Sequence, residues 1–183
     1  CQQLKTDKAI SHIPVILLTA RSLDEQRAEG YEHGADAYLS KPFSLRLLLS
    51  RIDNLIESRK KLNQTWSKGV EDDEIGNISN EIDKSFLKQL RKIIQENLAN
   101  SDLSVEQIGD EIGLSRVQLY RKVKALTGYS PVEIVRKARL TRARHLLQTT
   151  ERTVSEVAYA VGFSTPSYFS KCYKDEFGES PKK

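Results

Sequence analysis

Apolar residues follow two different periods along this chain, and the change of period divides it into two parts. A short apolar run at residues 15–20 is typical of a buried parallel strand, and residues 36–40 are expected to form a second short strand. From Ser44 onward apolar residues recur every three or four positions, which predicts amphipathic helices. These include a helix capped by Ser44 with apolar residues 45–56, one from Asp83 to Leu98, and one from Pro131 to about Gln148. The sequence also predicts a helix end and loop over 1–12, and a polar helix from Ser22 to Gly34.

The stretch from Ser104 to Gly128 has the pattern of a helix-turn-helix. Its first helix has an apolar stripe, includes Gly109 where a second helix can cross closely, and ends at Gly113 in a left-handed conformation. Ser115 is expected to cap the second helix. The residues expected to face inward are Val105, Ile108, Ile112, Leu119, Val123 and Leu126. An ordinary two-helix corner with a solvated basic face remains the alternative for this stretch alone.

A second copy of the pattern begins at Thr153. A shift of 49 residues places Val157 on Ile108, Ala158 on Gly109 and Gly162 on Gly113. After one extra residue the shift becomes 50, and it pairs Phe169 with Leu119, Lys171 with Arg121 and Lys174 with Lys124. Small residues at the helix crossing, a glycine in the turn and a cation on the second helix all recur, so the motif is an internal repeat.

Two helix-turn-helix units at this separation, the second reading VAYAVGFSTPSYFSKCYKDEFGESP, resemble the DNA-binding domain of the AraC/XylS family. The resemblance covers residues 81–183 and departs from the family pattern at Pro166, which is tolerated in a first helical turn. It implies that the second helix of each unit contacts base edges. The implied base contacts are Val117, Tyr120, Arg121, Ser167, Tyr168, Ser170 and Lys171. The implied phosphate contacts are Ser115, Arg116, Lys122, Ser164, Thr165 and Lys174.

The charge distribution agrees with a nucleic-acid partner. Residues 115–145 contain nine Lys or Arg and one acid, Glu133, whereas the net charge of the whole chain is only +4. A basic segment on predicted helices is the electrostatic signature of nucleic-acid binding. The alternative, a solubilising face, usually mixes both signs. Arg121 has the geometry to bond a guanine with two hydrogen bonds.

The N-terminal phrases PVILLTA and GADAYLSKPF together resemble the C-terminal half of a response-regulator receiver domain, which has a flavodoxin-like fold. By this resemblance Lys41 would pair with a phosphoryl group, Thr19 would move toward that group, and Tyr38 would swing inward with it. The Lys41–Pro42 bond would be cis. A lysine at the carboxyl end of a strand also points into the crevice where open α/β sheets bind ligands. The alternative is a surface lysine before a turn.

The acceptor aspartate and the acidic magnesium pair of a receiver lie on strands that would precede Cys1. Asp24, Asp36 and Asp53 match no acceptor position, so we assign no phosphoacceptor and no magnesium ligands within this chain. Two strands alone leave an open edge and bare apolar faces. We therefore expect residues 1–62 to self-associate. The chain has no methionine and is expected to be a piece of a longer protein.

The predicted fold class is mostly α, with an all-α C-terminal domain preceded by a partial α/β fragment. The predicted parts are the receiver half at 1–62, a linker at 63–80 and the double helix-turn-helix domain at 81–183. The amphipathic helix from Asp83 opens that domain, and the helix from Pro131 connects its two units.

The sequence contains no recognisable pattern for catalysis or metal binding. His12, His33 and His145 lack metal-ligand spacing, and no nucleophile, paired carboxylate or glycine-rich phosphate loop is recognisable. Cys1 and Cys172 lie in unrelated segments and suggest free thiols in a reducing compartment. No apolar run approaches transmembrane length. We therefore expect a cytoplasmic protein that is not itself an enzyme, needs no cofactor and makes no membrane contact.

These observations lead to one functional hypothesis with two alternatives. The chain is expected to be a sequence-specific transcription regulator at the output end of a two-component phosphorelay. Its expected partners are double-stranded DNA, a second copy of the chain and a histidine kinase, which the longer parent protein could itself contain. One alternative is a ligand-responsive AraC-type regulator. The other is a phosphorelay module that acts mainly through protein contact.

Overall fold

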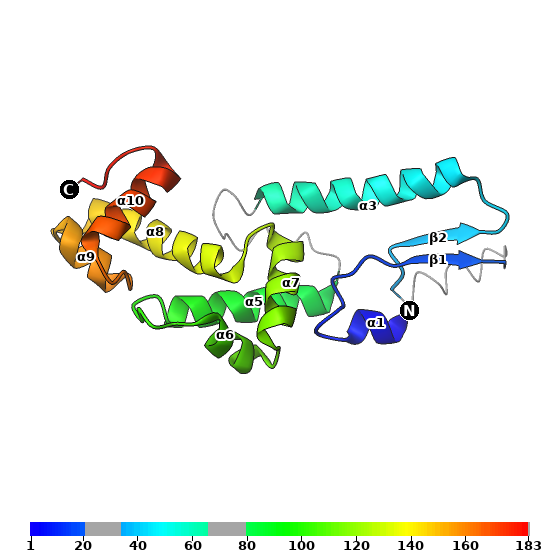
Figure 1. The fold of residues 1–183 in the computed structure, drawn as a ribbon, viewed down its shortest axis with the longest axis horizontal. Helices are drawn as coiled ribbons and strands as arrows, with labels where there is room; N and C mark the ends of the chain where they lie inside the picture. The colour runs from blue at the N-terminus through cyan, green and yellow to red at the C-terminus, as the bar shows by residue number, and fades with distance from the viewer. Residues whose placement is uncertain (21–33, 66–79, 183) are drawn as a thin grey trace.

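The computed structural model describes residues 1–20, 34–65 and 80–182 of this 183-residue chain, and most of them lie in helices (Figure 1). The N-terminal elements are α1 (Gln2–Thr6), β1 (Ile16–Thr19), β2 (Ala37–Ser40) and α3 (Leu45–Thr65). The C-terminal elements are α5 (Glu81–Glu96), α6 (Val105–Ile112), α7 (Arg116–Thr127), α8 (Pro131–Thr149), α9 (Val154–Ala160) and α10 (Pro166–Phe177). The predicted helix from Ser22 to Gly34 and the stretch 66–79 fall outside the described residues, except for Gly34.

The two predicted strands form a parallel pair. The first is not buried as expected: no residue of β1 is buried and Leu18 is 45% exposed. Ile16 lies opposite Ala37 and Thr19 opposite Ser40. The Lys41–Pro42 peptide bond is cis. Side-chain capping by Ser44 starts the following helix, because the Leu47 amide donates to Ser44 Oγ at 3.2 Å. The strand pair, the cis peptide bond and the Ser44 cap are therefore confirmed at the level of local structure.

Helix α3 differs from expectation in length and in coverage. It continues to Thr65, so residues 63–65 belong to a helix and not to the predicted linker. The physical reason is that no glycine or proline interrupts this segment. Its apolar face is only partly bare: Leu48, Ile52 and Leu55 are half-buried, and the helix packs against α7. Leu45, Leu47, Leu49 and Ile56 remain exposed.

Helices α5 to α10 enclose two separate hydrophobic cores that share one helix. The first core gathers buried residues of α5, α6, α7 and the start of α8, whereas the second gathers those of the end of α8, α9 and α10. Helix α8 contributes Ile134 and Val135 to the first core and Leu140, Ala143 and Leu147 to the second. In Figure 1 α8 runs between the two groups of helices, with the strands at the opposite end of the molecule from α9 and α10.

Capping side chains and glycines define the ends of these helices. The predicted roles of Ser115, Gly113 and Pro131 are confirmed. Ser104, Ser115, Ser130 and Thr153 each form a capping box with the residue three positions later. Gly113 ends α6 with φ +80°, and Pro131 and Pro166 start α8 and α10. Reciprocal bonds of this kind satisfy backbone amides that the first helical turn leaves unpaired. Within the described ranges, no helix is both long enough and apolar enough to cross a membrane.

Candidate nucleic-acid interface

The outer face of α7 presents the three side chains predicted to contact bases in the first unit. Val117 and Tyr120 are 56% and 49% exposed, and Arg121 is exposed beside them. The three lie three and four positions apart, opposite the buried Leu119. Large apolar side chains left in water on a helix that also carries a cation are suited to a groove of DNA, where they can meet thymine methyl groups.

Helix α10 presents the corresponding face of the second unit. Ser167, Tyr168 and Lys171 are exposed, whereas Ser170 is partly buried. The opposite side of the helix is fixed by Phe169, which is fully buried and packs against Phe163 with ring centroids 5.2 Å apart. Pro166 occupies the first turn of α10, as expected. The structure thus brings four predicted base contacts onto one short helix.

Five of the six predicted phosphate contacts are exposed at the ends of these helices. Thr165 caps α10 by accepting from the Tyr168 amide at 3.4 Å, and Arg116 forms an ion pair with Glu106 at 2.9 Å. The exposed members of the set are Ser115, Arg116, Ser164, Thr165 and Lys174. Their phosphate role stays a prediction, and for Arg116 it requires exchange of the carboxylate for a phosphate.

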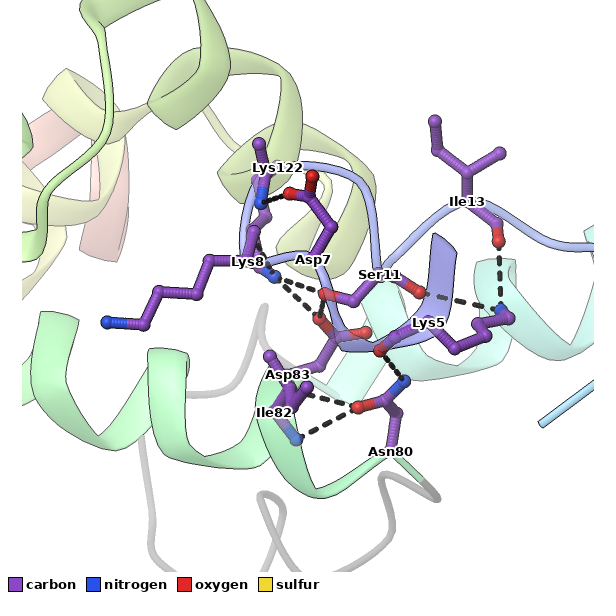
Figure 2. A network of polar contacts seen from close by, with 10 residues as sticks. Lys5, Asp7, Lys8, Ser11, Ile13, Asn80, Ile82, Asp83 and Lys122 are labelled. Atoms are coloured by element: carbon purple, nitrogen blue, oxygen red, sulfur yellow. Dashed lines mark hydrogen bonds and ion pairs between the residues drawn. The ribbon is translucent and has the colours of Figure 1, made fainter. Parts of the chain in front are cut away.

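The sixth predicted phosphate contact, Lys122, is wrong. Its side chain is fully buried and lies on the inner face of α7 (Figure 2). The ammonium Nζ is 2.7 Å from Asp83 Oδ1, donates to Ser11 Oγ at 2.7 Å and to the Lys8 carbonyl at 2.6 Å, and stands 4.8 Å from the Phe86 ring centroid. Burial lowers the pKa of the Lys122 ammonium, and the bond to Asp83 opposes that shift.

Sequence reasoning missed this buried ion pair, although a signal was available. Lys122 lies three positions after Leu119 and four before Leu126, so its position belongs to the apolar stripe of α7. Asp83 lies likewise on the stripe of α5, three positions before Phe86. Opposite charges on the inner stripes of two neighbouring helices predict a buried pair, because unpaired charges are excluded from cores.

The buried pair also joins the N-terminal segment to the helix-turn-helix region. Ser11 Oγ donates to Asp83 Oδ1 at 2.8 Å, 72 residues along the chain. Lys5, a residue of α1, is buried close by, where its Nζ lies 2.5 Å from Asp36 Oδ2 and donates to the Ile13 carbonyl at 2.9 Å. Figure 2 shows the contacts of Ser11 with Asp83 and of Lys5 with Ile13 meeting at the loop after α1. A change in the position of that loop would therefore alter the hydrogen bonds of Lys122 on the inner face of α7.

The cations of α8 are less available for DNA than the charge count of residues 115–145 suggests. Lys137 pairs with Glu176 and stands over the Tyr129 ring. Arg144 lies over the Phe177 ring at 4.8 Å. Arg139 donates to two backbone carbonyls, and burial lowers the pKa of its guanidinium. These cations stabilise the protein itself, so the basic segment is not one continuous DNA-binding stripe.

The three predicted receiver residues lie on or directly after the two strands. Tyr38 faces Leu17 across the pair, and Thr19 faces Ser40. The Lys41 amide donates to the Thr19 carbonyl at 2.6 Å, and the Lys41 side chain is exposed. The carboxyl ends of both strands therefore bring Thr19 and Lys41 together. In the described part of the chain, no group of three or more His, Cys, Asp or Glu side chains could hold a metal ion.

A family model described as a helix-turn-helix domain matches residues 108–183. A crystal structure of a transcriptional regulator from Chromobacterium violaceum, described as containing an AraC-type DNA-binding domain, is 33% identical, with a TM-score of 0.51. The match covers 54% of this chain and 87% of that structure. This chain carries an AraC-family DNA-binding domain. That part of the predicted resemblance is confirmed, whereas the receiver part stays a prediction.

Two further similar proteins have names that refer to two-component signalling. The C-terminal domain of AraT, a response regulator from Geobacillus stearothermophilus, is 34% identical, with a TM-score of 0.50 over 52% of this chain and 79% of that one. A protein named histidine kinase P4 from Formosa agariphila is 43% identical over 183 residues. The alignment spans 99% of this chain but 13% of the length of that relative.

Proposed function

We propose that this chain is the output end of a two-component phosphorelay, in which an AraC-family domain binds double-stranded DNA under the control of a receiver. The chain is a DNA-binding transcription regulator, because its relatives include proteins named transcriptional regulators and activators. The proposal also assigns residues 1–65 to the C-terminal portion of a receiver domain.

The observation that carries the DNA-binding proposal is the pair of exposed faces on α7 and α10, held by one continuous helix. Each face combines a cation with a tyrosine that is about half exposed, Tyr120 and Tyr168. Helix α8 has 19 residues and so is about 28 Å long at 1.5 Å per residue. One turn of DNA is about 34 Å, so two faces held at this spacing suit successive major grooves on one side of a duplex.

Three observations support the receiver assignment. The two parallel strands require a crossover connection between them, as in an α/β fold. Thr19 and Lys41 meet at the carboxyl edge, where open parallel sheets bind ligands. The Geobacillus protein, 34% identical to this chain over the AraC-family domain, is named a response regulator, and a 43% identical relative is named a histidine kinase.

The proposal names partners and a compartment. The partners are operator DNA, a histidine kinase, and a second copy of this chain that would cover the exposed face of α3. Magnesium would be held by strands of the intact receiver and not by this chain. The working compartment is the cytoplasm, where both the kinase output and the DNA are found.

The dependence of DNA affinity on salt tests the proposal quantitatively. Five exposed cations lie on the two second helices: Arg116, Arg121, Lys124, Lys171 and Lys174. If all five displace counterions from the duplex, whether they contact base edges or phosphates, log K falls with log salt at a slope of about −4.5, and binding weakens about 500-fold between 50 and 200 mM salt. Fluorescence anisotropy on a duplex selected from a random-sequence library measures this slope.

The two competing outcomes are distinct. A slope near zero would overturn DNA binding through these helices. A slope near −10, or about a 10⁶-fold loss over the same range, would mean that all nine cations of residues 115–145 contact phosphate in addition to Lys171 and Lys174. That result would contradict the internal pairing of Lys122, Lys137 and Arg139.

A further inference from the structure

The two helix-turn-helix units contact each other on both sides of α8. On one side Lys137 pairs with Glu176 of α10 and stands over the Tyr129 ring. On the other side a small junction centres on Arg139.

The Arg139 guanidinium, from the middle of α8, donates through Nε to the Leu98 carbonyl at 3.2 Å and through Nη2 to the Asn100 carbonyl at 2.5 Å. Both carbonyls belong to the loop between α5 and α6, in the first unit. Gly162, in the turn before α10, lies against the same atoms from the second unit.

Gly162 is tightly enclosed at this point. A Cβ atom placed on it would overlap the Leu98 carbonyl oxygen and would lie 3.1 Å from Arg139 Cζ and Nε. Its repeat counterpart Gly113 has nearly the same backbone, with φ +80° against +82°, yet nothing lies within 4 Å of its Cβ direction. Backbone conformation requires glycine at both positions. Only Gly162, of the two, is also required by contact with the other unit.

Two open grooves lie on either side of α8 near this junction. One of about 160 Å³ opens between Val105 and Val132 of the first unit and Phe163 and Tyr168 of the second. A larger one of about 660 Å³ lies among α5, α8 and the end of α10. Beside these grooves, the polar contacts of Arg139 and Lys137 add directed links between the two units to the continuous helix α8.

We propose that the Leu98–Arg139–Gly162 junction is a specificity-determining element that sets the distance and angle between α7 and α10. Arg139 positions the second unit by bonding the loop of the first, and Gly162 permits the close approach. Resting on the proposed DNA binding, this assigns the junction the task of selecting operators by the spacing of their two half-sites. Without the junction each unit would still fold on its own core but could tilt about α8.

Distance measurements between spin labels test the junction without DNA. In the full chain with Cys1→Ser and Cys172→Ala, labels at Glu111→Cys and Asp175→Cys, both at exposed positions, report the separation of the two units. Electron–electron double resonance should give a narrow distance distribution for the parent and a broadened one for Arg139→Gln or Gly162→Ala. Gly113→Ala, the matched control, carries the same backbone strain and should leave the distribution narrow.

A second measurement uses duplexes selected from a random-sequence library by the unmodified chain. Inserting one base pair between the half-sites should weaken parental binding by at least about tenfold, comparable to the cost of one mismatched pair. Arg139→Gln should lose most of that discrimination, and Arg139→Lys, which can bond one carbonyl, should recover part of it. Gly113→Ala should retain it.

The outcomes separate this proposal from the proposed function. Unchanged distance distributions in Arg139→Gln and Gly162→Ala, or equal broadening by Gly113→Ala, would overturn the junction. A parent that selects no duplex would overturn the proposed DNA binding, while the spin-label result would still decide whether the junction fixes the two units.

Discussion

The two helix-turn-helix units share one backbone design but fill it with different chemistry. Both begin in a capping box, turn through a glycine with φ near +80°, and end their second helix at a glycine, Gly128 or Gly178. The second unit is filled by aromatic rings, with Tyr173 and Phe177 centroids 4.7 Å apart. The first is filled by aliphatic side chains around a buried ion pair.

One position of the repeat concentrates this difference. The 50-residue shift pairs Lys122 with Cys172, and both are buried. In the second unit the thiol needs no charged partner. In the first, the ammonium draws in Asp83 of α5 and Ser11 of the N-terminal segment. The comparison teaches that caps and glycines fix the repeated backbone, whereas the inner side chains record which neighbours each unit has. The first unit is coupled to the N-terminal region through this pair.

The largest expected effect comes from breaking the buried pair. Lys122→Ala leaves the Asp83 carboxylate buried without its cation, and it should lower the free energy of unfolding by about 3–5 kcal/mol. Urea denaturation followed by circular dichroism measures this loss. Lys124→Ala, two positions along on the exposed side, is the control and should change stability by less than about 0.5 kcal/mol.

A double variant sharpens the same test. Lys122→Met with Asp83→Leu replaces both charges by apolar side chains, and it should recover much of the stability that Lys122→Ala loses. Equal stability of Lys122→Ala and Lys124→Ala would contradict the buried pair. It would also restore Lys122 to the predicted phosphate contacts.

The residue at the helix crossing, Gly109 or Ala158, also distinguishes the two units. A Cβ on Gly109 would lie 2.6 Å from the Leu114 carbonyl oxygen, so Gly109→Ala should lower the unfolding free energy by about 1–3 kcal/mol through overpacking. The second unit already has an alanine there, Ala158, which is fully buried. Ala158→Gly should cost about 1 kcal/mol through the poor helix propensity of glycine. Thermal denaturation of both variants measures these losses. An unchanged melting temperature for Gly109→Ala would contradict the predicted difference between the units.

A last set of variants distinguishes the roles of the exposed cations on α7 and α10 in DNA binding. Arg121→Ala should lose about 1–3 kcal/mol of binding at one base pair, because a guanidinium can bond guanine through two donors. Lys171→Ala, its repeat counterpart, should lose less discrimination, because an ammonium is a point charge. Lys174→Ala should weaken selected and random duplexes alike. Anisotropy titrations on both kinds of duplex measure these effects, and equal losses for Arg121→Ala on both would make Arg121 a phosphate contact.

Local signals in the sequence were sufficient to predict most of the secondary structure. Gly113, Ser115, Pro131 and Pro166 each act within one helical turn, where short-range geometry decides the conformation. Ser44 likewise acts within the first turn of α3, and the two strand segments were recognisable as short segments of the sequence. The end of α3 at Thr65 was missed because this stretch has no strong stop signal.

Contacts between distant segments were harder to predict from the same signals. The bond from Ser11 to Asp83 joins residues 72 positions apart, and no local pattern specifies such a partner. Lys122 was misassigned because its residue type outweighed its place on the apolar stripe. No local pattern marks Arg139 as a link to the first unit, and only the fold shows that it reaches Leu98 and Asn100.

The sharing of α8 between two cores constrains how this domain can change in evolution. An insertion of one residue near Ala138, between the core residues of the two units, would advance the second unit by about 1.5 Å and rotate it by about 100°. The two DNA-facing helices would then point to different sides of the molecule. About seven added residues would be needed to bring them back to one side, roughly 10 Å farther apart. A substitution on the surface of one unit therefore alters that unit alone, whereas a change in the length of α8 alters the relation between both.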